Sequence, residues 1–126
     1  MQLGEDRAMA EFGEDGFHRL VAAFYQRVRT DDVIGIMYPE NDWDGAEWRL
    51  RAFLCQRFGL SNDYSQQRGH PRLRMRHMPF AIGPAERDRW LEIMSAAMDE
   101  TDVPAKVRAI LTPFFVQVAE HMRNRD

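Results

Sequence analysis

The chain has 126 residues, 44% of them apolar, and a formal net charge of −3 at pH 7. This length and composition suit one compact domain, expected to span residues 1–126, and they exclude disorder and polyanion binding through net charge. No apolar run approaches the roughly 20 residues of a transmembrane helix, and residues 1–14 lack the pattern of a signal peptide, so we expect a cytoplasmic protein without a membrane partner.

Residues 16–30 form the first predicted helix. Apolar side chains recur there every three or four residues, which is the spacing of one buried helical face, and Asp15 is suited to cap the start. A short helical turn is expected over 31–37, and it should end at Tyr38 because a residue before proline avoids the helical region. The apolar positions of the first helix are Phe17, Leu20, Val21, Phe24, Tyr25 and Val28.

The second helix is predicted to begin at Asp44 and to end before Gly59. Asp44 and Glu47 have the spacing of a capping box, in which each side chain accepts from the other residue's backbone amide. The following stretch, 60–69, is polar and has no helical period, so it predicts a loop. The apolar face of this helix is formed by Ala46, Leu50, Phe53, Leu54 and Phe58.

Prolines delimit the helices in the second half of the chain. The segment 68–77 allows a short helix at most, which Pro79 should close, and Pro84 opens a longer helix. The last helix is expected over 103–124, with a kink or a break at Pro113. The periodicity is helical almost throughout, and it predicts an all-α fold with about four substantial helices.

His77 is the strongest candidate for a metal ligand, although a histidine on a helical face more often has an ordinary structural role. The sequence contains no spacing typical of zinc or calcium sites, and the single Cys55 cannot form an internal disulfide or a thiolate site alone. What remains is a site with one protein ligand, and haem iron accepts a single histidine.

An arginine-rich segment surrounds this histidine. Three interpretations stay open, namely a solvated surface, contact with nucleic-acid phosphates, and pairing with the two carboxylates of a haem. The lack of any wider basic region weakens the nucleic-acid interpretation. The segment contains Arg68, His70, Arg72, Arg74 and Arg76.

Tyr25, Tyr38 and Trp90 each carry a hydrogen-bond donor on a large apolar body. A buried hydroxyl needs a partner, because an unsatisfied one costs free energy. For each residue in isolation, the simplest interpretation is a core side chain whose donor meets a backbone carbonyl. The functional alternative is a donor aimed at a bound ligand.

Taken together, these residues resemble the group II truncated haemoglobins. The resemblance runs in one unbroken order over a little more than half of the chain, and its most telling part is the arginine-rich segment that ends at His77. It is carried by Phe24 and Tyr25, Met37 to Glu40, Ala46 and Glu47, Leu50, Gln67 to His77, Pro79 and Phe80, and Glu86 to Trp90.

The sequence departs from that family at three points. A glycine pair near the start of the first helix is split here into Gly13 and Gly16, Phe58 stands where a tryptophan is common, and Pro113 interrupts the last helix. The first departure affects the packing of the N-terminal segment and the last affects the straightness of the final helix. None of them touches the residues expected at the haem.

The resemblance implies a truncated-globin fold, a two-over-two sandwich in which helices B and E face helices G and H around a haem b. His77 corresponds by position to the proximal iron ligand on a short helix F. The distal pocket is expected to contain Tyr25, Tyr38, Ala46, Leu50 and Trp90. The residues expected to contact the haem itself are Arg49, Leu50, Phe53, Tyr64, Met75, Arg76 and His77, with Arg49, Arg76 and Tyr64 as candidates for the propionates.

The function implied by the resemblance is reversible oxygen binding at a five-coordinate iron, for oxygen transport or for oxygen-dependent redox chemistry. An alternative is detoxification of nitric oxide or peroxide, as a nitric oxide dioxygenase or a peroxidase-like enzyme with an external reductase as partner. A remote alternative from the arginine-rich segment is a helical nucleic-acid-binding module. The pattern predicts no particular oligomeric state.

Overall fold

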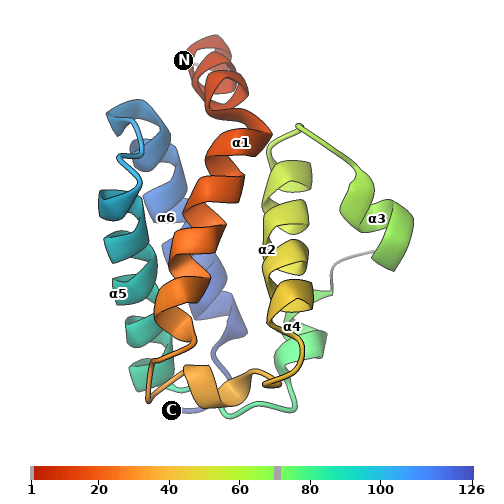
Figure 1. The fold of residues 1–126 in the computed structure, drawn as a ribbon, viewed down its shortest axis with the longest axis vertical. Coiled ribbons are helices and arrows are strands. Elements are labelled where there is room, and N and C mark those ends of the chain that lie inside the picture. The colour runs from red at the N-terminus through yellow and green to blue at the C-terminus, as the bar shows by residue number, and fades with distance from the viewer. Residues whose placement is uncertain (1, 70–71) are drawn as a thin grey trace.

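The computed structural model describes residues 2–69 and 72–126, and all regular structure in these ranges is helical. The predicted all-α fold is therefore confirmed. None of the described helices is both long and apolar enough to cross a membrane. In chain order the helices are α1 (Gln2–Val28), the 3-10 turn η1 (Gly35–Met37), α2 (Trp43–Arg57), α3 (Asp63–Arg68), α4 (Leu73–His77), α5 (Pro84–Glu100) and α6 (Ala105–Met122) (Figure 1).

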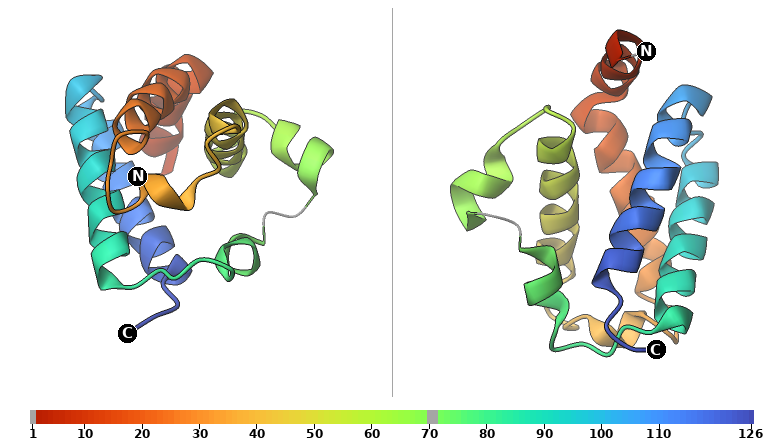
Figure 2. Two further views of the ribbon diagram at one scale, coloured as in Figure 1. Left: turned by 60° about the horizontal axis from the view of Figure 1, so that its bottom comes forward. Right: turned by 180° about the vertical axis from the view of Figure 1, so that it is seen from behind.

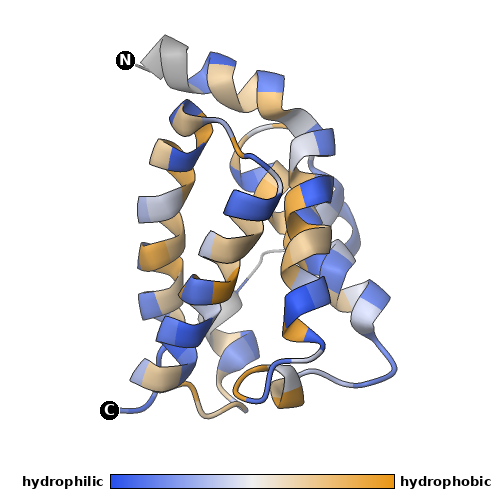
Figure 3. Ribbon diagram, turned by 60° about the vertical axis from the view of Figure 1, so that its left-hand side comes forward, coloured by the Kyte–Doolittle hydropathy of each residue, from blue (hydrophilic) through white to orange (hydrophobic). Residues whose placement is uncertain are grey.

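The four long helices form two layers, with α1 and α2 on one side and α5 and α6 on the other (Figures 1 and 2). Helix α1 is central, since it packs against α2, α5 and α6, and α5 packs against α6. Hydrophilic and hydrophobic residues alternate along the long helices (Figure 3), as expected for helices that each have one face toward a core. The largest fully buried side chains are Phe17, Leu20, Val21, Phe24, Val28, Leu54, Met94, Val107 and Leu111.

Helix α1 begins earlier than predicted. It starts at Gln2 and continues through a kink at Gly13, whose φ of 64° lies in the left-handed region that favours glycine. Gly16 permits close packing at the kink, because a Cβ there would lie 2.5 Å from the ring of Phe12. The predicted start at about residue 16 lies close to the beginning of the part of α1 that follows the non-helical Gly13. The helical segment before Gly13 was not predicted, and Asp15 lies inside the helix and not at its cap.

Helix α2 starts differently from the prediction and ends as predicted. It begins at Trp43, the side chain of the N-cap residue Asp42 makes no capping hydrogen bond, and the predicted capping box at Asp44 is therefore wrong. Its C-terminus has the two hydrogen bonds of a Schellman motif, in which Gly59 (φ 77°) donates to Gln56 and Leu60 donates to the Cys55 carbonyl at 2.8 Å.

The segment predicted as a polar loop contains the short helix α3. Its first turn is stabilised by two side chains, since the Asp63 amide donates to Ser61 Oγ at 3.1 Å and the Ser65 amide donates to Gln56 Oε1 at 2.8 Å. Tyr64 is the buried residue of this helix. Six residues with one buried side chain are too few to produce a visible hydrophobic period, which is why the sequence pattern missed this helix.

Pro113 does not break the last helix. Helix α6 is continuous from Ala105 to Met122 with the proline inside it. A proline in a helix loses one backbone hydrogen bond, but Leu111 and Phe115 on either side are buried in the core. Both halves of the helix thus pack into the core, and of the two outcomes predicted at Pro113, a kink or a break, the break is wrong.

A buried carboxylate fixes the turn after α1. Asp31 Oδ2 accepts from the amides of Val33 and Ile34 at 3.0 and 2.9 Å, and its Oδ1 accepts from Arg89 Nε at 2.6 Å. Only 4% of the Asp31 side chain is exposed, against 42% for Arg89. The carboxylate thus joins this turn to α5, next to Trp90.

We expect Asp31→Ala to lower the free energy of unfolding at pH 7 by about 1–3 kcal/mol, because the buried amide of Ile34 and the partly buried amide of Val33 lose their acceptor. Burial alone would raise the pKa of the Asp31 carboxyl, but the hydrogen bonds from Ile34, Arg89 and Val33 outweigh burial and lower that pKa below its usual value. The stabilisation is therefore present above the unfolded-state pKa of about 3.9 and is lost as the pH falls through the folded-state pKa. Urea unfolding at pH 7 and at low pH measures both effects.

The control for this variant is Asp32→Ala, which removes an exposed neighbouring carboxylate. It should change the free energy of unfolding by less than about 0.5 kcal/mol. A loss at Asp31 that is equally large at pH 7 and below its folded-state pKa would contradict this account of the turn.

Candidate functional site

Aromatic residues from three parts of the chain meet at one end of the helical sandwich. The ring of Tyr25, from α1, lies 5.6 Å from the ring of Tyr38, which follows η1, and the two are nearly perpendicular. Phe24 joins this pair to α5, because its ring is 5.1 Å from Tyr25 and 5.2 Å from Trp90. The three donor-bearing residues singled out in the sequence therefore belong to one aromatic cluster.

The side chains of Tyr25 and Tyr38 lie close enough for each to shift the pKa of the other. Burial raises the pKa of Tyr25 well above its usual value, and the neighbouring Tyr38 raises it further. Burial also raises the pKa of Tyr38, while the hydrogen bond with Tyr25 and the Arg49 charge act in the opposite direction. Both phenols thus stay protonated at neutral pH, so each hydroxyl group can act as a hydrogen-bond donor.

Trp43 is a member of this cluster that the sequence analysis missed. Its ring stacks on Tyr38 at 5.4 Å with an interplanar angle of 29°, and it lies 6.3 Å from Tyr25. The Arg29 guanidinium is 5.6 Å from the centroid of the Trp43 ring. Trp43 is the first residue of α2 and lies one turn before Ala46 on the same helical face. It was missed because the helix was predicted to begin at Asp44, one residue later.

The predicted contact residues of α2 follow one helical stripe. Ala46 is buried, whereas Leu50 and Phe53, one and two turns later, are only half-buried at the margin of the core. Among the described residues, α2 has extensive helix contacts only with α1 and α3. The stripe is thus less completely covered than the equivalent apolar faces of α1 and α6.

His77 is the last residue of α4, a helix of five residues that contacts α6 (Figure 2). The His77 side chain is half-buried. Large apolar side chains near it are exposed to an unusual degree, at 58% for Met75, 51% for Met78 and 38% for Phe80. Neighbouring apolar side chains that are exposed to water are typical of a surface that binds another apolar group.

The predicted propionate partners lie in different surroundings. Arg49 pairs with the Asp42 carboxylate at 3.1 Å, and the exposed Arg76 donates to the Arg68 carbonyl at 3.4 Å. Tyr64 is buried, with its ring 6.0 Å from that of Phe53. His70 and Pro71 lie outside the described residues, as do the side chains of Leu73 and Arg74.

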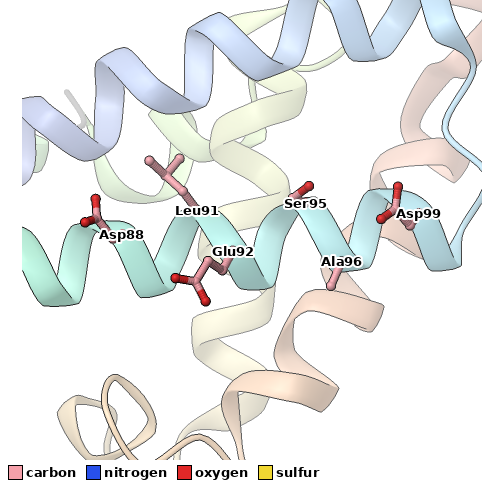
Figure 4. Close-up of a pocket in the computed structure, with 6 residues that line it drawn as sticks. All are labelled: Asp88, Leu91, Glu92, Ser95, Ala96 and Asp99. Carbon is pink, nitrogen blue, oxygen red and sulfur yellow. The ribbon is translucent and has the colours of Figure 1, made fainter.

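One side of α5 carries a shallow surface depression that offers no comparable chemistry (Figure 4). It is formed by a single helix, and each of its carboxylates already has an arginine partner. Arg108 contacts Asp99, Arg87 contacts Asp88 at 3.0 Å, and Arg89 contacts Glu92 at 3.1 Å. Its lining residues are Asp88, Leu91, Glu92, Ser95, Ala96 and Asp99.

Comparison with known proteins identifies the family. A family model described as bacterial-like globin matches residues 12–124. The group 2 truncated hemoglobin of Bacillus subtilis is 34% identical over 113 residues, which cover 90% of this chain and 85% of that protein.

Solved structures agree with this match. The thermostable hemoglobin of the actinobacterium Thermobifida fusca has a TM-score of 0.85 and 50% identity, with coverage of 89% of this chain and 91% of that one. The truncated oxygen-avid haemoglobin of Bacillus subtilis has a TM-score of 0.87 and 32% identity, with coverage of 93% and 98%. The predicted two-over-two fold and the resemblance are thus confirmed. The chain belongs to the bacterial-like globins, as a group II truncated haemoglobin, and this family binds diatomic gases at a haem.

Proposed function

We propose that this globin binds oxygen and other small diatomic gases reversibly at the iron of a haem b, with His77 as the proximal ligand. Tyr25, Tyr38 and Trp90 are the proposed hydrogen-bond donors on the distal side. The observation that carries this proposal is the protonated Tyr25 and Tyr38 pair, which lies in the same aromatic cluster as Trp90.

The chemistry of the available donors fits a haem. Among the described residues, no three or more histidine, cysteine or carboxylate side chains are grouped so that they could hold a metal ion. A haem needs only one axial ligand from the protein, because the porphyrin supplies four nitrogens. His77, at the end of α4, is the imidazole proposed for that role.

The apolar and basic side chains also fit the group. The exposed Met75, Met78 and Phe80 beside His77 provide apolar area for one side of a macrocycle, and the half-buried Leu50 and Phe53 of α2 provide it for the other. Arg49 and Arg76 are the proposed partners of the propionates, since arginine binds carboxylates through two parallel hydrogen bonds. Arg49 already binds one carboxylate, that of Asp42 at 3.1 Å, at the start of α2.

The distal residues act as hydrogen-bond donors in a pocket that is shielded from water. When bound, the haem supplies the iron at which a gas molecule is held. Tyr25 is 4% exposed, so its hydroxyl is shielded from water and its hydrogen bonds are stronger than those of an exposed tyrosine. Trp43 and Phe24 flank the tyrosine pair and exclude water from it. Ala46 has no side-chain donor, which leaves this role to the three aromatic residues.

Several donors around one gas molecule favour slow release. This property suits oxygen-dependent chemistry better than rapid delivery, and the description of the Bacillus subtilis relative as oxygen-avid agrees with it. The second candidate function is therefore a nitric oxide dioxygenase or peroxidase-like enzyme that receives electrons from an external reductase.

Trp90→Phe tests the distal assignment. We expect oxygen to dissociate about three- to tenfold faster in stopped-flow measurements, because one hydrogen bond of about 0.5–1.5 kcal/mol is lost. The phenylalanine ring keeps most of the packing against Phe24 and Phe115. Trp48→Phe is the matched control, since Trp48 stacks on Tyr64 and not on the cluster. Equal dissociation rates for Trp90→Phe and the wild type would contradict the role of Trp90 as a donor.

A further inference from the structure

The side chain of Asn124 joins the end of the chain to the segment that carries His77. Its Nδ2 donates to the Phe80 carbonyl at 2.8 Å and to the His77 carbonyl at 3.4 Å, and its Oδ1 accepts from the Ile82 amide at 2.9 Å. The backbone continues the contact, because the amides of Asn124 and Arg125 both donate to the Ile82 carbonyl. Residues more than 40 positions apart are thus joined by five hydrogen bonds, three through the Asn124 side-chain amide and two through backbone amides.

Helix α4 needs support from outside itself. A helix of five residues is too short to be stable on its own in water, and its N-cap residue Arg72 has a left-handed conformation (φ 46°) without a side-chain capping bond. Among the described residues, its main helix contact is a small one with α6. The exposure of Met75 and Met78 shows that core packing contributes little to holding this segment.

Asn124 connects the segment 77–82 to the packed core. It follows Met122, which is buried at the end of α6, by two residues, so its backbone is fixed to the packed part of the molecule. An asparagine suits this role because one short side chain carries both an acceptor for the Ile82 amide and a donor for the two carbonyls. Aspartate would keep the acceptor but lose the donor, and alanine would lose both.

We propose that Asn124 is a positioning residue that fixes the backbone of residues 77–82 and thereby orients the His77 imidazole toward the haem iron. This inference rests on the proposed function, in which His77 is the proximal ligand. The inference adds that tight haem binding requires a fixed backbone around His77 as well as the imidazole itself. An imidazole at the end of a mobile short helix would bind the iron less tightly. Partners that orient a metal ligand typically change metal affinity by 10- to 100-fold when removed.

The test compares Asn124→Ala and Asn124→Asp with the wild-type holoprotein. We expect haem transfer to an excess of a scavenging apoglobin to be about 10- to 100-fold faster for Asn124→Ala, and the iron–histidine stretching band of the reduced protein to shift or broaden. Asn124→Asp should lie close to Asn124→Ala, because it cannot donate to the His77 and Phe80 carbonyls. Amide hydrogen exchange over residues 78–82 should also be faster in both variants.

Two controls separate positioning from general stability. Asp126→Ala changes an exposed side chain of the same terminal segment, and Val107→Ala removes buried volume at the opposite end of α6. Both should keep the wild-type iron–histidine band and the wild-type exchange over residues 78–82. If Asn124→Ala matches Val107→Ala in haem loss and keeps the wild-type band, the inference is wrong. A wild-type protein without an iron–histidine band would instead overturn the proposed function, and this inference with it.

Discussion

His77→Ala is expected to raise the rate of haem loss by more than about a hundredfold, which is the largest effect of any single substitution in this globin. Substitution of residues that only orient a ligand already costs 10- to 100-fold in metal affinity, and His77 is the proposed ligand itself. The reduced protein should also lose the iron–histidine stretching band. Haem transfer to a scavenging apoglobin measures the first effect, and resonance Raman spectroscopy measures the second.

The matched control is His18→Ala, which removes an exposed histidine from α1. It should leave haem loss unchanged within about twofold, since it lies outside the proposed haem contacts. His77→Gly adds a rescue experiment, because the space left by the side chain admits imidazole from solution, which should restore the absorption spectrum. A His77→Ala variant that retains haem like the wild type would remove the ligand assignment.

Tyr25→Phe is expected to give the second large effect, an oxygen dissociation rate about 10- to 100-fold higher. Hydrogen bonds in a dry site contribute about 1.5–3 kcal/mol when charge is involved, and each 1.4 kcal/mol corresponds to a tenfold change. The variant keeps the ring that packs edge-on against Phe24 and Tyr38, so the fold should be preserved. Stopped-flow measurement of oxygen release gives the rate directly.

Trp48→Phe is again the control. It changes an aromatic side chain that stacks on Tyr64 and does not belong to the distal cluster. The two hydroxyls of the distal pair should behave as a unit, so the combined effect of Tyr25→Phe and Tyr38→Phe should differ from the sum of the single effects. Equal rates for Tyr25→Phe and Trp48→Phe, or strictly additive effects of the two tyrosine substitutions, would contradict the proposed distal pair.

Much of the fold was predictable because burial leaves a periodic trace in the sequence. The stripe that includes Phe17 and Phe24 is buried as predicted, and Gly59 and Pro84 mark helix boundaries through their backbone preferences. The start of α2 was not predictable in the same way. A capping box at Asp44 was expected, but the helix begins one residue earlier, and Asp42 pairs with Arg49 instead.

Sequence patterns predicted less of the site than of the fold. Periodicity left His77 and Tyr25 with ordinary structural interpretations, and only the family resemblance gave them roles in gas binding. Trp43 and Asn124 were missed for a physical reason. Their contacts depend on the tertiary arrangement, with Asn124 reaching residues more than 40 positions away, and no pattern of neighbouring residues records such a contact.

The most direct test of the central claim is the visible absorption spectrum of the purified protein after haem is supplied. The spectrum should be recorded in the oxidised state, in the reduced state without oxygen, and under oxygen. We predict a Soret band in all three, a five-coordinate spectrum in the reduced state, and a shift under oxygen that reverses when oxygen is removed. A protein that stays colourless with haem present, or a reduced spectrum that oxygen does not change, would contradict reversible oxygen binding at a haem.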